Sequence, residues 1–187
     1  IGEFKVNGHV DGEFPVGKDT MRLEAKAYVR NETPDYFVQH YRSNHFIWNN
    51  DFQKTYRFYV GGMLTYPTKY VTPKVNVGFE NITRYIYFDS IGSPVQMDGN
   101  IQILAIDAHS KRFGMENNVV YQLSSSEAIP LPAITLYHNI YYQDTWFKAL
   151  GVQIGVDMRF HTKYFAPILN PALGQFCIQS KEKIGNY

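Results

Sequence analysis

Residues 149–165 alternate between apolar and polar side chains over a run much longer than the usual β-strand. One parity carries Leu150, Val152, Ile154, Val156, Met158, Phe160, Thr162 and Tyr164, and the other carries Gly151, Gln153, Gly155, Asp157, Arg159, His161 and Lys163. Successive side chains of a strand point to opposite faces, so the two sets lie on opposite sides. Most strands of water-soluble domains have about 5–6 residues, whereas a tilted strand that crosses a bilayer needs about 9–11. The pattern therefore predicts a strand with one face toward lipid and one toward water.

The same alternation recurs in the first half of the chain. It predicts strands over residues 4–16, 21–30, 54–66 and 71–80. Short segments rich in Pro, Gly and Asp, at 15–19 and 66–68, separate these strands in pairs, which is typical of tight hairpins. Two longer segments, 31–51 and 81–97, interrupt the pattern and are predicted to be loops.

The later strands are less regular. Residues 100–108 and 118–125 are predicted to be strands, but Leu104 and Ile106 compete with Ile101 and Ile103 for the apolar side. A further strand is predicted over 134–143, where His138 falls on the apolar parity. Because a histidine in hydrocarbon is costly, a bulge or a different face is expected there. Residues 166–176 are predicted to be loop.

About eight strands joined by alternating short and long connections predict an all-β fold, an antiparallel up-and-down transmembrane β-barrel. The chain of 187 residues favours a single domain, residues 1–187. No run of eighteen apolar residues is present, so no transmembrane helix is expected. The net charge of +1 and the lack of a local run of Lys or Arg give no reason to expect nucleic acid as a partner.

No enzymatic motif stands out, and the chain is not expected to be an enzyme. The serines at 124–126 lack the strained turn that activates a hydroxyl in a GxSxG elbow. Cys177 is the only cysteine, which leaves neither an internal disulfide nor a multi-cysteine zinc site. His9 with Asp11, and Asp157 with His161, share faces, but a metal site needs three or four converging ligands. No catalytic residue, metal or cofactor is predicted.

Four segments resemble the putative-porin family, large outer-membrane β-barrels from Bacteroidota. They are NHFIWNND (44–51), VNVGFENITRYIYF (75–88), LPAITLYHNIYYQD (131–144) and GVDMRFHTKYFAPILNPALGQFCIQSKEKIGNY (155–187). Members of that family are longer and continue with further strands after a segment similar to KIGNY. The resemblance implies that this chain is a later portion of a larger barrel, incomplete at both ends. It also implies a bacterial outer-membrane location.

The polar parity of the strands supplies the candidate lumen-lining residues. They are Lys5, Asn7, His9, Asp11, Glu13, Arg22, Glu24, Lys26, Arg57, Gln153, Asp157, Arg159, His161 and Lys163. These side chains mix both signs of charge. They are expected either to set ion selectivity in a water-filled lumen or to brace the barrel through paired charges.

Three functions are compatible with this pattern. The first is a porin-like barrel in outer-membrane lipid that passes ions or small polar solutes. The second is a non-conducting barrel that serves as a scaffold or binding surface for copies of itself or for surface lipoproteins. The third is a soluble, aromatic-rich β-sandwich that binds glycans. His40, His45 and Trp48 lie in a predicted loop that could grip a sugar or peptide, or fold over its own aromatic residues.

Overall fold

The computed structural model describes residues 2–110 and 114–186, and these are largely β-strand. Both ends of the predicted domain, Ile1 and Tyr187, lie outside the described residues. The long strands are β1 (Phe4–Val16), β2 (Asp19–Glu32), β5 (Thr55–Thr65), β6 (Val71–Phe88), β7 (Pro94–Ser110), β8 (Met115–Ser124), β9 (Ile134–Trp146) and β10 (Leu150–His161). The short elements are α1 (Tyr36–Gln39), β3 (His40–Arg42), β4 (Ile47–Asn49), β11 (Ile168–Asn170) and β12 (Gln175–Cys177).

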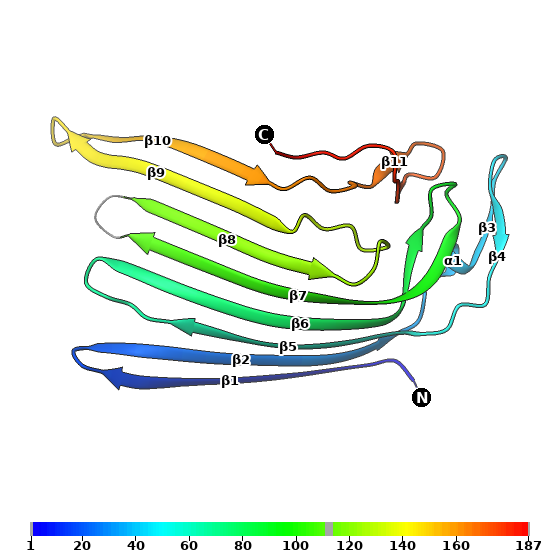
Figure 1. Ribbon diagram of the computed structural model, residues 1–187, viewed down its shortest axis with the longest axis horizontal. Coiled ribbons are helices and arrows are strands. Elements are labelled where there is room, and N and C mark those ends of the chain that lie inside the picture. Colours follow the sequence, from blue (N-terminus) through cyan, green and yellow to red (C-terminus); the bar gives the residue numbers. More distant parts are fainter. Residues whose placement is uncertain (1, 111–113, 187) are drawn as a thin grey trace.

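The long strands form one curved sheet in the order β1-β2-β5-β6-β7-β8-β9-β10, and each pairs antiparallel with its neighbours along the chain (Figure 1). This confirms the predicted all-β, up-and-down antiparallel fold. The hairpin turns β1–β2, β5–β6 and β9–β10 lie together at one end, which we call the turn end, with the end of β7 and the start of β8 beside them. All other connections lie at the opposite end, the loop end.

The sheet is open, so the closed barrel that the alternation predicts does not form within the described residues. β1 and β10 are the two edges of the strand order. Beyond β10, Tyr164 forms an antiparallel bridge with Ile184, and the Asn186 N–H donates to the His161 carbonyl at 2.8 Å. The C-terminal segment therefore pairs with the chain where β10 ends.

The loop prediction for residues 81–97 is wrong. β6 and β7 continue through this segment as a long hairpin whose tip is only residues 89–93. A register shift between Ile82 and Tyr85, with Arg84 at a φ of 62°, lets the two strands stay paired across an irregularity. The predicted alternation of short and long connections fails here because most residues of this segment extend β6 and β7 instead of forming a loop.

The other predicted loops also contain structure. Residues 31–51 begin with the end of β2 and include α1 and the two-stranded sheet β3–β4. Residues 166–176 contain β11 and the start of β12, and β12 pairs parallel with β6 through Cys177 and Phe88. Among the described residues, no helix has the length and hydrophobicity that crossing a membrane requires.

One face of the sheet, which we call the apolar face, exposes large hydrophobic side chains from every long strand. Val156 is 74% exposed, Val10 72% and Val77 55%. Leu104 and Ile106 also lie on it, since Leu104 pairs with Val77 and Tyr121. A β-sandwich would bury such a face under a second sheet, but in the described part of the chain the only other sheet is the small β3–β4 pair. The architecture therefore disfavours the glycan-binding sandwich.

His138 lies on the apolar face, so the expected bulge or change of face is wrong. The register of β9 with both β8 and β10 runs through His138 without a shift. His138 pairs directly with Asn117, and its Nδ1 lies in hydrogen-bond contact with the Asn117 side-chain oxygen. This contact pairs one polar atom of each residue, which lowers the cost of placing them among apolar neighbours.

The most buried residues gather at the loop end. Ile82 is 1% exposed, Ala128 4% and Cys177 6%. Aromatic rings from separate segments also pack at this end. The ring centroids of Trp48 and Phe88 lie 6.0 Å apart in an edge-to-face arrangement. Burial, and secondarily the charge of Asp89, raise the pKa of the Cys177 thiol. The loop end is therefore a packed structure and not a set of free loops.

Candidate functional site

The predicted lumen residues can be located by following the strand register. Lys5, Asn7, His9, Asp11 and Glu13 pair with Arg30, Tyr28, Lys26, Glu24 and Arg22. The pairing continues strand by strand to Gln153, Asp157, Arg159 and His161 on β10. Directly opposed residues share a face, so all the candidates within strands lie on one side, which we call the charged face. Lys163 lies beyond the end of β10.

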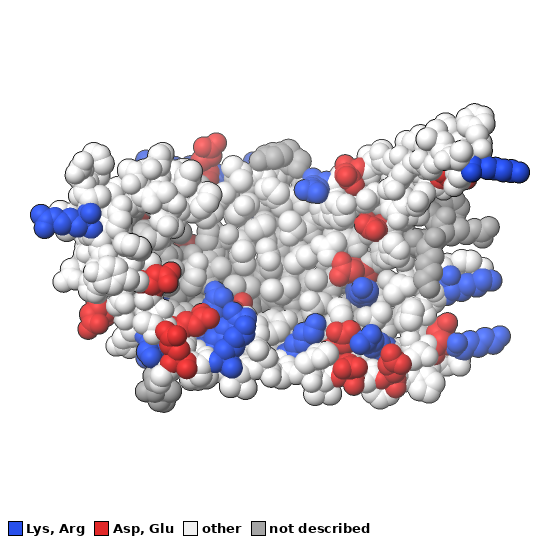
Figure 2. Space-filling view, turned by 180° about the vertical axis from the view of Figure 1, so that it is seen from behind, with Lys and Arg blue, Asp and Glu red and all other residues white. Residues whose placement is uncertain are grey.

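Figure 2 shows the charged face. Its middle is hollowed and largely uncharged, and most Lys, Arg, Asp and Glu side chains gather over its lower half, where β1, β2 and β5 lie. The hollow follows from small or apolar residues in the central strands: Gly78, Gly99 and Ala105 are all buried there. The face therefore combines an uncharged trough with a charged flank.

Glu24 is the centre of a charge cluster on β1 and β2. Its carboxylate lies 3.4 Å from Arg22 Nε, 3.6 Å from Lys26 Nζ and 3.9 Å from His9 Nε2. Asp11 adds contacts of 3.8 Å to Arg22 and 3.9 Å to His9. The Glu24 side chain is only 15% exposed, whereas its partners are about half exposed. This geometry agrees with the prediction that paired charges brace the charged face.

A second cluster connects β2, β5 and β6. The rings of Tyr28 and Tyr59 stack with centroids 5.1 Å apart, and the Arg30 guanidinium lies 4.6 Å above the Tyr28 ring. The Tyr28 hydroxyl donates to Glu80 at 2.7 Å, and Arg57 Nη1 lies 3.9 Å from the same carboxylate oxygen. Hydrogen bonds and ring stacking hold these side chains in fixed positions on the charged face.

The opposite flank, β7 to β10, is polar with fewer charges. The Tyr137 hydroxyl donates to Asp157 at 3.3 Å, and the Arg159 guanidinium lies 5.4 Å from the Tyr137 ring centre. Asp107 accepts from the Asn118 amide on the neighbouring strand. His109 and Glu116 lie 3.7 Å apart near the turn end. Charged groups therefore line both flanks of the trough.

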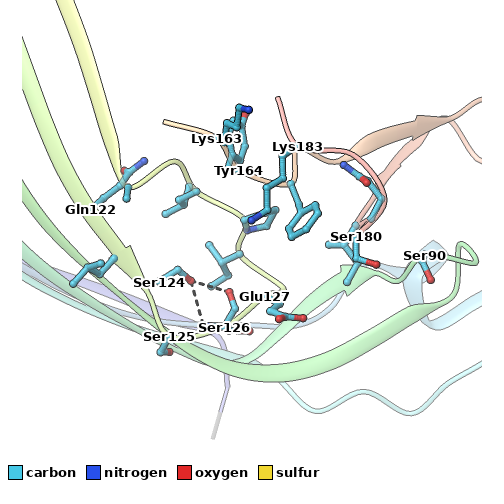
Figure 3. A pocket seen from close by; sticks show the side chains of 18 residues that line it. Ser90, Gln122, Ser124, Ser125, Ser126, Glu127, Lys163, Tyr164, Ser180 and Lys183 are labelled. Carbon is cyan, nitrogen blue, oxygen red and sulfur yellow. Dashed lines mark hydrogen bonds between the residues drawn. The ribbon is translucent and has the colours of Figure 1, made fainter. Parts of the chain in front are cut away.

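A cavity of about 510 Å³ lies at the loop end, between the β8–β9 connection and the segment after β10 (Figure 3). The β8–β9 connection bends over the charged face, since the Gln122 side chain donates to the Pro132 carbonyl at 2.9 Å and Ile129 packs beside Gly99. Lys183 extends from the C-terminal segment toward this connection. Lys163 and Lys183 both line this cavity. Lys163, the predicted lumen residue outside the strands, therefore lies at the loop end.

The remaining candidates do not converge on a reactive site. Within residues 2–110 and 114–186, no group of three or more His, Cys, Asp or Glu side chains is placed to hold a metal ion. Trp48 stacks on Tyr41 at 4.6 Å and donates to the Phe37 carbonyl at 3.1 Å. His40 contacts Asn49 at 2.5 Å. The aromatic loop is thus packed on its own residues, which agrees with the second of the two alternatives predicted for it.

Sequence analysis missed several charged-face residues. Tyr28 and Arg30 share the parity of Lys26, and Tyr59 shares that of Arg57, so the alternation contained the necessary signal. Glu80 shares the parity of Lys74 and pairs with Tyr59. The residues of β7 and β8 carried no such signal, because the apolar Ile101 and Ile103 lie on the charged face.

Comparisons with known proteins add one finding. The sequence model of a family described as putative porin matches residues 1–187. No curated protein and no solved structure matches the chain.

Proposed function

Since the chain belongs to the putative porin family, we propose that it forms part of the wall of an outer-membrane pore. Ions or small polar solutes pass along the charged face by diffusion, with no cofactor and no catalytic step. The bacterial outer membrane is the proposed location, and an origin in Bacteroidota rests on the sequence resemblance alone.

The separation of the two faces is the observation that carries this proposal. Each long strand presents exposed apolar residues on one side, and across the eight strands the opposite side carries the charged residues together with polar and small ones. An apolar face this broad is stable in contact with lipid, whereas it would drive aggregation in water. The opposite face is hollowed and carries charged side chains, which suits the wall of a water-filled lumen.

We further propose that the two free edges pair with additional strands in the complete barrel. Unpaired strand edges are not tolerated in hydrocarbon, because each buried N–H or C=O without a partner costs several kcal/mol. The hydrogen bond from the Asn186 N–H to the His161 carbonyl supports this proposal, since it brings backbone onto the free edge at the last residue of β10.

A second function, a non-conducting barrel that binds partners at the cell surface, is favoured by one feature of the loop end. Tyr36 is 68% exposed, Phe37 and Ile47 are each 71% exposed and Ile91 is 74% exposed, although they belong to a well-packed region. Exposed aromatic and aliphatic side chains on a rigid support are typical of protein-binding surfaces.

Single-channel recording of the full-length protein in a planar bilayer distinguishes these functions. Protease protection must first verify insertion. Discrete current steps that scale with salt concentration are expected for an open pore. Verified insertion without current would contradict the pore and favour the surface-binding barrel.

A further inference from the structure

Three cationic residues form a line across the charged face near the loop end. Lys5 pairs with Arg30 in the β1–β2 register, and Arg30 pairs with Arg57 in the β2–β5 register. We call Lys5, Arg30 and Arg57 the cationic row. Neighbouring strands lie about 4.8 Å apart, so the row spans about 10 Å. No sequence window reveals it, because its members come from three strands.

The cationic row is poorly compensated by acidic groups. Arg57 Nη1 lies 3.9 Å from a carboxylate oxygen of Glu80. Neither Lys5 nor Arg30 makes an ion pair within the described part of the chain. Arg30 Nε is buried and lacks a hydrogen-bond partner among the described atoms. Like charges directly opposite each other destabilise a sheet. An external anion would relieve the repulsion by contact with the exposed parts of the row.

Two acidic residues, Glu3 and Glu32, lie toward the loop end from the row. A Glu3 carboxylate oxygen accepts the Thr33 N–H at 3.1 Å, and hydrogen bonds from Thr33 lower the pKa of the Glu3 carboxyl. Glu32 makes no ion pair within residues 2–110 and 114–186. These groups set an acidic rim outside the row and do not neutralise it by contact.

A tyrosine platform holds the row in place. Tyr59 lies against Gly61 and Gly78, where an added Cβ at either glycine would overlap its hydroxyl group. Tyr28 stacks on Tyr59 and is tied to Glu80, and Arg30 lies over Tyr28. The Arg30 guanidinium is therefore positioned before any ligand arrives, which reduces the entropy lost on binding.

We propose that the cationic row binds the carboxylate or phosphate groups of small anionic solutes as they pass through the lumen. Guanidinium groups present paired N–H donors that match the geometry of both oxyanions. A row of this length suits solutes with two or three anionic groups better than a monovalent ion. This inference rests on the proposed pore and names the class of solute that the pore favours.

Citrate is the probe for the test, with inorganic phosphate as the smaller oxyanion. Calorimetry of the full-length protein in detergent measures citrate binding whether or not the protein conducts. Planar-bilayer recording measures the reduction of current by citrate. Arg30→Gln should weaken citrate binding about tenfold, the factor that corresponds to one charge-assisted hydrogen bond. Lys5→Gln should act in the same direction and avoids the packed tyrosines, because Lys5 is exposed on the edge strand.

Arg42→Gln is the matched control, since Arg42 is an exposed arginine of β3, outside the large sheet. It should leave citrate affinity unchanged. A conducting pore that does not bind citrate would overturn the inference and leave the proposed function intact. Equal losses in Arg30→Gln and Arg42→Gln would also overturn it, because the effect would then be general surface charge. Binding in detergent without any channel current would instead contradict the pore alone.

Discussion

At the scale of single residues, the environment of a side chain here is decided by its parity within a strand. Asp157 contacts Tyr137 across the charged face, while its neighbour Val156 is 74% exposed on the apolar face. A shift of one residue would exchange these environments along the whole strand. Exceptions to the rule are therefore informative, and His138 with Asn117 is the clearest of them.

The His138–Asn117 pair is expected to behave as one unit. His138→Leu should destabilise the protein by about 1–3 kcal/mol, because it leaves the Asn117 side chain without its partner on the apolar face. Asn117→Leu should cost a similar amount. The double substitution should restore stability to near that of the unsubstituted protein, since replacing both partners by apolar groups leaves nothing unsatisfied.

Urea unfolding of the full-length protein in lipid vesicles gives these free energies. The double-mutant cycle should show a coupling energy about as large as the two single losses added together. Additive losses would show that the two side chains do not depend on each other.

At the scale of elements, the long strands were predictable and the loop end was not. The strands predicted at 4–16 and 54–66 match β1 and β5 almost residue for residue, because strict alternation marks a strand with two different environments. Alternation fails in residues 81–97, where the register shift after Ile82 changes the parity. Asn81 and Gly92 also resemble turn residues, although only Gly92 lies in a turn.

The charged face was predictable to the same extent. Parity located the polar residues of β1, β2 and β10, whereas the contacts among them depend on which strands become neighbours. Arg30 and Arg57 are separated by the whole α1 and β3–β4 excursion, so no local pattern places them side by side. Pairing register is a long-range property, and a single strand does not contain it.

Packing at the tip of the β6–β7 hairpin can be tested through Gly92. Its φ is +86°, and an added Cβ would lie 2.8 Å from Leu173 and 3.1 Å from Phe46. Gly92→Ala should therefore displace the segment around β11 and β12, in addition to straining the backbone. A loss of about 1 kcal/mol in local stability corresponds to roughly fivefold faster amide exchange over residues 168–177.

Gly17→Ala is the matched control. Gly17 has a φ of +65° but nothing within 4 Å of an added Cβ. It should strain the β1–β2 turn locally and leave exchange over residues 168–177 unchanged. Equal exchange in both variants would show that the hairpin tip does not clamp β11 and β12.

At the scale of the whole molecule, the eight long strands separate an apolar face from a charged face, and the proposed function places these faces in lipid and in water. Neighbouring residues at three places along the sheet allow a direct test of this orientation. In a Cys177→Ser background, cysteine at Asp11, Asn76 or Asp157 should react with a water-soluble, membrane-impermeant maleimide in vesicles. Cysteine at Val10, Val77 or Val156 should react slowly, because lipid covers the apolar face.

The three pairs serve as their own controls, since each compares adjacent positions at nearly the same depth. Faster labelling at the valine positions would reverse the assignment of the faces. Equal labelling within every pair would indicate that water reaches both faces and that the sheet is not in a membrane.

The long strands of the sheet pair only with their neighbours along the chain, and contacts between more distant segments lie at the loop end. Such an array can lengthen by duplication of one hairpin without breaking any contact inside the others. Barrel diameter grows about linearly with strand number. We therefore expect the width of the proposed pore to differ between related barrels in steps of two strands, with the loop-end packing changed at each step.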